Sequence, residues 1–141
     1  MTEPARPYTL VAELTYRCPL RCGYCSNPVD GGGSARALAT DEWVRVLVQA
    51  EALGVVQVHF TGGEPLVRKD LESLVAAARA LDLYSQLVTS GVPLTQARLR
   101  ALRDAGLDCV QLSIQAADAA TSDAIAGRAC FADKLEVARW V

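Results

Sequence analysis

The chain of 141 residues lacks any long hydrophobic run. No stretch approaches the roughly 18 uninterrupted apolar residues that a membrane-spanning helix needs. The first residues also lack the apolar segment of a signal peptide, because they include Glu3, Pro4, Arg6 and Pro7. These absences argue against a membrane-embedded or exported protein, and we expect a cytoplasmic location.

The chain has no strong excess of charge of either sign. Its 14 basic and 16 acidic residues give a formal net charge of −2. Proteins that bind nucleic acids or anionic membranes through electrostatics usually carry strongly basic surfaces. We therefore expect neither a nucleic acid nor a membrane as partner. With 51% hydrophobic residues, the chain has enough apolar surface for one globular domain with a core.

Cysteine is present, but not in the pattern of a disulfide-stabilised secreted domain. The five cysteines are an odd number, and Cys18, Cys22 and Cys25 form a Cys-x3-Cys-x2-Cys cluster. Thiolates this close together select zinc, copper(I) or an iron–sulfur cluster. A structural zinc site normally has four protein ligands, and this cluster is one ligand short. An iron–sulfur cubane held by three cysteines would leave one iron open to another ligand.

Short apolar segments alternate with longer amphipathic ones, as in repeated β–α units with a parallel sheet. We expect strands at 8–14, 55–61, 83–89 and 108–114, and helices at 41–53, 71–81, 96–105, 119–126 and 133–141. The expected helix boundaries carry N-cap residues and terminal glycines, namely Thr40, Asp70, Thr95, Gly54 and Gly106. Glycines 31–33 predict a mobile loop.

The predicted strands alternate between apolar and polar side chains. In the second strand, Val56, Val58 and Phe60 alternate with Gln57, His59 and Thr61. Parallel strands buried on both faces are almost wholly apolar, and the interior of an eight-stranded β/α barrel is filled with Val, Ile and Leu. We therefore predict an α/β fold of about four β–α units, an incomplete (partial) β/α barrel whose concave side lines a polar cavity.

A second motif, Gly62-Gly63-Glu64-Pro65, follows the predicted second strand. Parallel β–α folds place their chemistry in the loops after the strands, so this loop and the cysteine loop should meet at one edge. The two glycines would let the backbone approach a ligand closely, and Glu64 could accept hydrogen bonds from an ammonium group.

The two motifs, in this order and placement, resemble those of the radical S-adenosylmethionine (SAM) superfamily. The resemblance implies a partial barrel in which Cys18, Cys22 and Cys25 hold a [4Fe–4S] cluster. The open iron of such a cluster chelates the amino and carboxylate groups of SAM. An electron from the reduced cluster then cleaves the sulfonium, and the resulting 5′-deoxyadenosyl radical abstracts hydrogen from the substrate.

The same resemblance implies a set of cofactor-binding residues and assigns no protein side chain as catalytic. Tyr24 would lie against the adenine, and Gly62, Gly63 and Glu64 would meet the amino end of the methionine moiety. Ser90, Ser113 and Gln115 would contact the ribose or the carboxylate. Two arginines beside the cysteines, Arg17 and Arg21, would offset the charge of the thiolates.

Within the superfamily, the chain is most similar to the PqqA peptide cyclases of pyrroloquinoline quinone (PQQ) biosynthesis. The similar segments are 12–28, 60–71 and 110–115, and the context Tyr-Arg-Cys-Pro-Leu-Arg-Cys is the most specific. The resemblance implies an oxidoreductase that forms a carbon–carbon cross-link between a glutamate and a tyrosine of the PqqA precursor peptide. It also implies two partners, the peptide chaperone PqqD and an electron donor such as a flavodoxin.

Members of that family are longer than this chain and carry a C-terminal domain with auxiliary iron–sulfur clusters. We therefore expect residues 1–141 to be the N-terminal part of a radical SAM core domain, with the auxiliary-cluster domain absent. Two alternatives remain open at this point: another radical SAM peptide maturase, or a truncated remnant that binds a cluster without turnover.

Overall fold

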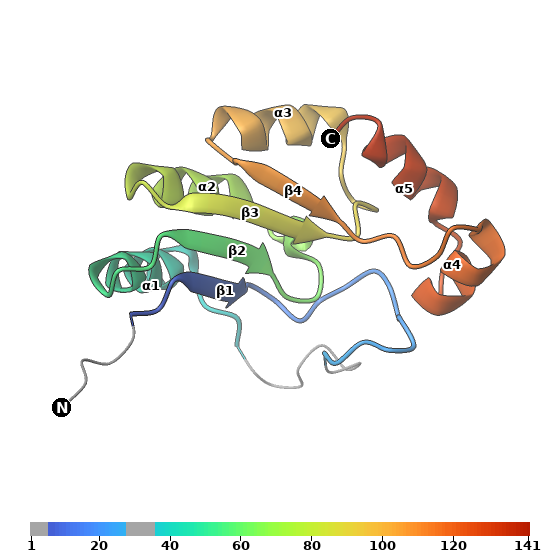
Figure 1. Ribbon diagram of the computed structural model, residues 1–141, viewed down its shortest axis with the longest axis horizontal. Helices are drawn as coiled ribbons and strands as arrows, with labels where there is room; N and C mark the ends of the chain where they lie inside the picture. The colour runs from blue at the N-terminus through green and yellow to red at the C-terminus, as the bar shows by residue number, and fades with distance from the viewer. Residues whose placement is uncertain (1–5, 28–35) are drawn as a thin grey trace.

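Four parallel strands form a single sheet in the computed structural model, which describes residues 6–27 and 36–141. The strands lie in the order β1 (Thr9–Glu13), β2 (Gln57–Thr61), β3 (Tyr84–Thr89) and β4 (Cys109–Leu112). All four point toward the same edge of the sheet (Figure 1). The predicted α/β class and the four predicted strands are confirmed. The predicted mobile loop at 31–33 lies outside the described residues.

The five predicted helices are also present, and a short 3₁₀ helix that the sequence did not predict follows the glycine motif. They are α1 (Thr40–Ala52), η1 (Pro65–Val67), α2 (Leu71–Ala80), α3 (Gln96–Asp104), α4 (Ala119–Ala126) and α5 (Phe131–Ala138). Helix α5 begins before its predicted start, with Cys130 at its N-cap position. No helix in the described ranges combines the length and hydrophobicity that a bilayer crossing needs.

The core lies between one face of the sheet and helices α1, α2 and α3 (Figure 1). The alternate strand residues predicted to be apolar point into it, including Val58 and Phe60 of β2. Leucines on one side of each helix pack against them, because residues three or four apart share a helix face. These buried leucines are Leu47, Leu74 and Leu102.

The opposite face of the sheet is polar and partly open. Gln57, His59 and Thr61 of β2 are half-buried there, as predicted. Hydrogen bonds join polar side chains across the strands, from Gln57 Nε2 to Thr9 Oγ1 at 2.6 Å and from Gln86 Nε2 to Gln111 Oε1 at 2.9 Å. The sequence pattern thus correctly identified which face the helices leave uncovered.

Two predictions at the strand ends are wrong. The alternation of apolar and polar residues put Val56 of the second predicted strand on the apolar face, and the same alternation in the fourth predicted strand put Ile114 there, but they are 45% and 43% exposed. Both lie just outside the strands, where the alternation of side chains between the two faces no longer applies.

The predicted N-cap positions are correct in two cases of three. Thr95 accepts a hydrogen bond from the backbone N–H of Arg98, as a capping residue should. Asp70 occupies the N-cap position of α2, but its carboxylate makes no capping bond and instead accepts bonds from Arg68. Thr40 is the first residue of α1, with Ala39 at the N-cap position, and its hydroxyl donates to Asp70 at 2.6 Å.

Candidate functional site

The loops that carry the predicted site residues leave the same edge of the sheet, because all four strands are parallel (Figure 1). The cysteine loop follows β1, and the Gly62-Gly63-Glu64 loop follows β2. Ser90 follows β3, and Ser113 and Gln115 follow β4. This edge is the one at which parallel β–α folds place their binding sites.

Hydrogen bonds join the glycine loop to both the start and the end of the cysteine loop. The N–H of Glu64 donates to the carbonyl of Arg17 at 2.9 Å, and Asn27 Nδ2 donates to the carbonyl of Gly62 at 2.7 Å. Gly62 has a φ of +128°, and a Cβ there would lie 2.3 Å from the carbonyl oxygen of Thr15. A Cβ on Gly63 would lie 2.6 Å from the carbonyl oxygens of two residues of the same segment.

These distances give a physical reason for the two glycines that differs from the sequence-based one. We expected the missing side chains to admit a ligand. The space that each Cβ would fill is instead taken by the backbone of residues 15–17, which leads into the cysteine loop. The glycine motif therefore positions the cysteine loop against β2, whatever else it contacts.

The Glu64 carboxylate is completely buried and fully hydrogen-bonded. Its Oε1 accepts from the N–H of Leu66 at 3.1 Å and from the hydroxyl of Thr89 at 2.6 Å. Its Oε2 accepts from the N–H and the hydroxyl of Ser90, at 2.8 and 2.5 Å. A carboxylate offers about four acceptor positions, so protein donors fill those of Glu64. In this arrangement the side chain joins the loop after β2 to the loop after β3.

We predict that Glu64→Gln destabilises the chain by about 3 kcal/mol, because hydrogen bonds to charged groups contribute about 1.5–3 kcal/mol each. In glutamine, an NH₂ group would replace one of the two carboxylate oxygens. That NH₂ group would face N–H and hydroxyl donors, to which it cannot act as an acceptor. Urea unfolding followed by circular dichroism measures the change. Glu13→Gln is the matched control, since Glu13 is exposed at the end of β1 and should change stability by no more than about 0.5 kcal/mol. Equal stability of the two variants would contradict this role of Glu64.

The cysteine loop is held on its other side by the junction of α4 and α5. The N–H groups of Arg21 and Gly23 donate to the carbonyls of Ala126 and Ile125, each at 3.0 Å. Between these two contacts, the half-buried Cys22 packs against a small apolar cluster that includes Ala126. No sequence pattern indicated this contact, which joins segments about a hundred residues apart.

All three clustered cysteines are free thiols, with Cys18 and Cys25 exposed and Cys22 half-buried. Burial raises the pKa of Cys18. The hydrogen bond from the Leu20 N–H to its sulfur lowers this pKa, whereas the nearby charges of Glu64 and of the other two thiols raise it further. Burial also raises the pKa of Cys22, while the positive charge of Lys134 lowers it. Metal binding by these thiols therefore releases protons.

The donor set of the cysteine loop has the chemistry that an iron–sulfur cluster needs, because its three candidate ligands are free thiols on one loop. In the described ranges, no three His, Cys, Asp or Glu side chains come close enough to hold one ion. The set offers three soft donors, and the Cys18 sulfur already accepts a backbone hydrogen bond, a contact that tunes cluster potentials.

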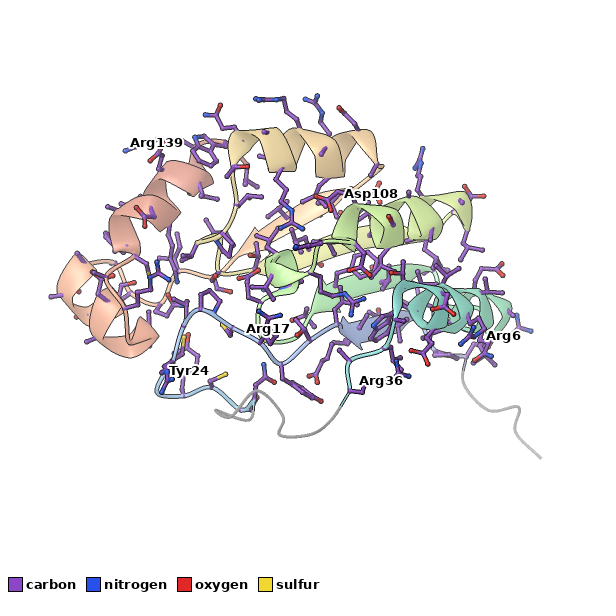
Figure 2. All side chains as sticks on the ribbon, turned by 180° about the vertical axis from the view of Figure 1, so that it is seen from behind. Arg6, Arg17, Tyr24, Arg36, Asp108 and Arg139 are labelled. Carbon is purple, nitrogen blue, oxygen red and sulfur yellow. The ribbon has the colours of Figure 1, made fainter. Side chains whose placement is uncertain are left out.

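The remaining predicted residues lie around this loop in different environments. Tyr24 is 68% exposed near the outer end of the cysteine loop (Figure 2). The Ser90 hydroxyl is directed to Glu64, as described above. Ser113 and Gln115 lie beyond the end of β4, where a carbonyl oxygen and a side-chain oxygen accept hydrogen bonds from Lys134. Their roles in binding a cofactor stay predictions.

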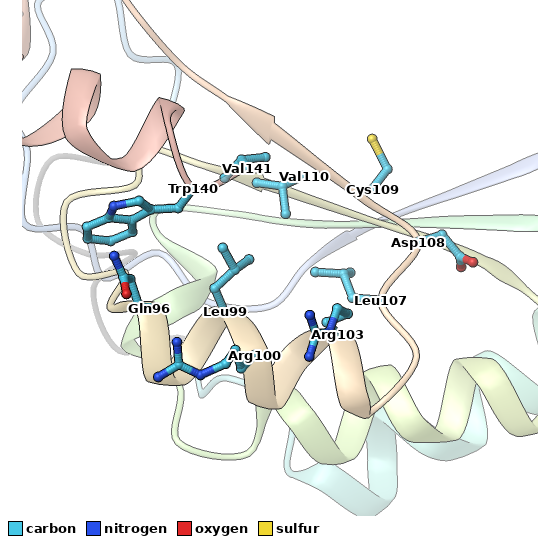
Figure 3. A pocket seen from close by; sticks show the side chains of 10 residues that line it. All are labelled: Gln96, Leu99, Arg100, Arg103, Leu107, Asp108, Cys109, Val110, Trp140 and Val141. Carbon is cyan, nitrogen blue, oxygen red and sulfur yellow. The ribbon is translucent and has the colours of Figure 1, made fainter.

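A cavity of about 460 Å³ lies elsewhere, between α3, β4 and the last residues of the chain (Figure 3). Its lining includes Leu99, Leu107, Val110 and Trp140, together with two arginines of α3. It includes none of the predicted site residues, so we do not associate it with the cysteine loop.

Comparison with known proteins gives a family and a fold. The model of a family described as the radical SAM superfamily matches residues 12–141. Among solved structures, Streptococcus suis SuiB bound to its precursor peptide SuiA is 25% identical, with a TM-score of 0.82. SuiB bound to S-adenosylmethionine has a TM-score of 0.79 at the same identity. A protein named anSMEcpe, with bound AdoMet, is 18% identical with a TM-score of 0.75 and shares the fold.

These matches cover most of this chain but less than half of the matched proteins. SuiB aligns with 95% of this chain, which spans 30% of the SuiB chain in the complex with SuiA and 29% in the complex with S-adenosylmethionine. The anSMEcpe match covers 94% of this chain and 40% of that protein. The four-stranded sheet is therefore the partial β/α barrel of radical SAM structures, as predicted.

Proposed function

The chain belongs to the radical SAM superfamily, and on that basis we propose that it is the cofactor-binding part of a radical SAM enzyme that modifies a peptide. The superfamily uses a [4Fe–4S] cluster and SAM. The observation that carries the proposal is the fixed position of the cysteine loop. Backbone hydrogen bonds hold it between the glycine loop after β2 and the α4–α5 junction.

We assign Cys18, Cys22 and Cys25 as the ligands of the cluster. When bound, the cluster supplies the electron that cleaves SAM, so that hydrogen can be abstracted from an unactivated carbon. The chain's own residues give this chemistry a rigid setting. Glu64 joins the loops after β2 and β3, and Asn27 ties the end of the cysteine loop to Gly62.

We assign the remaining predicted residues to the binding of SAM. Tyr24 is exposed and free to cover an adenine ring. We assign Gly62, Gly63 and Glu64 to the amino end of the methionine moiety, although the Glu64 carboxylate itself is buried and bonded to Thr89 and Ser90. Ser90, Ser113 and Gln115 line the adjoining ends of β3 and β4. The polar face of the sheet, with His59 and its neighbours, is the surface that we assign to the substrate.

For the substrate, we propose the PqqA precursor peptide, in which a glutamate carbon becomes joined to a tyrosine ring carbon. The support for this choice is the sequence around the cysteines, from Tyr16 to Cys22, and the segments at 60–71 and 110–115. The proposal includes a chaperone, PqqD, an electron donor such as a flavodoxin, and a cytoplasmic location. It also places residues 1–141 as the N-terminal part of a longer radical SAM core, followed in the whole enzyme by an auxiliary-cluster domain.

A second candidate is another radical SAM enzyme that acts on a different peptide. The similarity to SuiB, whose structure contains its precursor peptide SuiA, favours a peptide substrate without favouring PqqA.

The test uses the 141-residue chain, reconstituted with iron and sulfide under anaerobic conditions and reduced with dithionite in the presence of SAM. We expect 5′-deoxyadenosine to accumulate, measured by liquid chromatography and mass spectrometry. With PqqD and a PqqA peptide deuterated at its glutamate side chains added, deuterium should appear in the 5′-deoxyadenosine, because the radical abstracts its hydrogen atom from that side chain. Cleavage of SAM without any change in PqqA would favour the second candidate. A loaded, reduced chain that cleaves no SAM would contradict the enzymatic proposal and leave a non-catalytic remnant.

A further inference from the structure

Lys134 of α5 is a completely buried cation without an acidic partner. Its side chain is 0% exposed. Its Nζ donates to the carbonyl oxygen of Ser113 at 3.1 Å and to Oε1 of Gln115 at 2.5 Å. Among the ion pairs of residues 6–27 and 36–141, none involves Lys134. An ammonium has three N–H donors, and neutral acceptors take two of them, so its charge has no compensating anion in the described chain.

An uncompensated buried charge is costly. Removing an ammonium from water has an effective penalty of several kcal/mol, and buried charges are normally paired or bound to an ion. The chain has only two lysines, Lys69 and Lys134, and one of them is buried. The burial of Lys134 therefore points to an anion that binds beside it.

The helix that carries this ammonium packs beside the cysteine loop. Lys134 is one helical turn after Cys130, and the backbone N–H of Lys134 donates to the backbone carbonyl of Cys130 at 3.0 Å. Residues four apart lie on the same face of a helix. Cys22 packs against the apolar cluster that contains Cys130, so this face of α5 is turned toward Cys22. Consistent with this placement, the charge of Lys134 lowers the pKa of the Cys22 thiol against the larger effect of burial.

Resting on the proposed function, we infer that Lys134 is the buried counter-charge of the iron–sulfur cluster on Cys18, Cys22 and Cys25, and that it raises the cluster's reduction potential. Reduction transfers one electron from an external donor, such as dithionite or a flavodoxin, to the cluster. No bond is formed or broken in this step. The reduced cluster carries one more negative charge than the oxidised one, so a fixed cation stabilises it more.

The exposed arginines of the cysteine loop are weaker candidates for this role. We expected Arg17 and Arg21 to offset the charge of the thiolates, but both are exposed to solvent. Water and salt screen the interactions of exposed charges, whereas a buried charge is screened much less. Lys134 is a positioning residue that acts through the cluster, and not a catalytic residue.

The test is an anaerobic redox titration of the reconstituted 141-residue chain without SAM, with the reduced cluster quantified by electron paramagnetic resonance. Lys134→Met removes the charge and keeps an unbranched side chain. Gln115→Glu keeps the lysine but places a carboxylate where Oε1 now lies 2.5 Å from Nζ. We expect each change to lower the equilibrium constant for reduction about tenfold, which corresponds to about 59 mV for one electron.

Two control variants separate the charge effect from structural damage. Lys134→Arg keeps the charge and should keep most of the potential. Arg21→Met removes an exposed charge from the cysteine loop and should shift the equilibrium constant less than twofold. Circular dichroism and iron content identify the variants that fold and load the cluster, and Gln115→Glu keeps the test decisive where Lys134→Met does not fold.

Unchanged potentials in Lys134→Met and Gln115→Glu, with intact clusters in both, would overturn the role of Lys134 and leave the proposed function standing. A wild-type chain that folds but assembles no cubane would contradict the proposed function, and the role of Lys134 would then also be excluded. A lowered potential in the two variants, with Arg21→Met unchanged, is the result that the inference predicts.

Discussion

Replacing Cys22 by alanine should abolish cluster assembly. In anaerobic reconstitution, the wild-type chain should bind about four irons and four sulfides per three clustered cysteines and turn brown. Cys22→Ala should retain only background iron, because two thiolates then remain and two irons lack a protein ligand. Iron and sulfide analysis together with the visible absorption spectrum measures this loss. The same result is expected for alanine at Cys18 or Cys25.

The matched control is Cys109→Ala. Cys109 lies half-buried on β4, outside the cysteine loop. The variant should load the same amount of iron as the wild-type chain. A colourless wild-type protein that takes up one zinc ion through the three cysteines would contradict the assignment. So would a full iron load in Cys22→Ala.

Gly62→Ala should be among the most destabilising single changes in the chain. Its φ of +128° is unfavourable for any residue with a Cβ, and that Cβ would lie 2.3 Å from the Thr15 carbonyl oxygen and 3.1 Å from the Thr15 nitrogen. Both neighbours are backbone atoms, so no flexible side chain can move aside. Strained backbone conformations cost about 1–3 kcal/mol, and overpacking adds a similar amount. We expect a loss of about 4 kcal/mol in urea unfolding.

Gly23→Ala provides the control within the cysteine loop itself. Nothing lies within 4 Å of the position that a Cβ on Gly23 would take. Alanine there should change the free energy of unfolding by less than about 1 kcal/mol, and loss of chain entropy in the unfolded state favours a small gain. Iron loading should survive in Gly23→Ala and fall in Gly62→Ala. Equal stabilities for the two variants would show that the glycine loop is not locked to residues 15–17.

The sequence predicted the sheet and the edge of the site for a simple physical reason. Side-chain alternation identifies the strands and their two faces, and parallel strands bring their following loops to one edge. The cysteine loop and the Gly62-Gly63-Glu64 loop could therefore be placed at one edge of the sheet from the sequence alone. Errors at Val56 and Ile114 arose because alternation does not show where a strand stops.

The contacts that hold the site together could not be predicted in the same way. Glu64 bonds to Thr89 and Ser90, which lie on the next β–α unit, and nothing in the local sequence indicates these partners. Lys134 stands in an ordinary amphipathic helix pattern, in which a lysine normally marks the solvent face. Its burial depends on how α5 packs beside the cysteine loop, and that is a property of the tertiary structure.

We propose that Cys18, Cys22 and Cys25 hold a cubane with one iron open to an external ligand. Electron–nuclear double resonance on the reduced, reconstituted chain tests this assignment, with SAM isotopically labelled at its amino nitrogen or its carboxylate. We expect magnetic coupling between the label and the cluster, and its loss when unlabelled SAM replaces the labelled cofactor. A cubane that shows no coupling to bound SAM, or one whose fourth iron already carries a protein ligand, would contradict it.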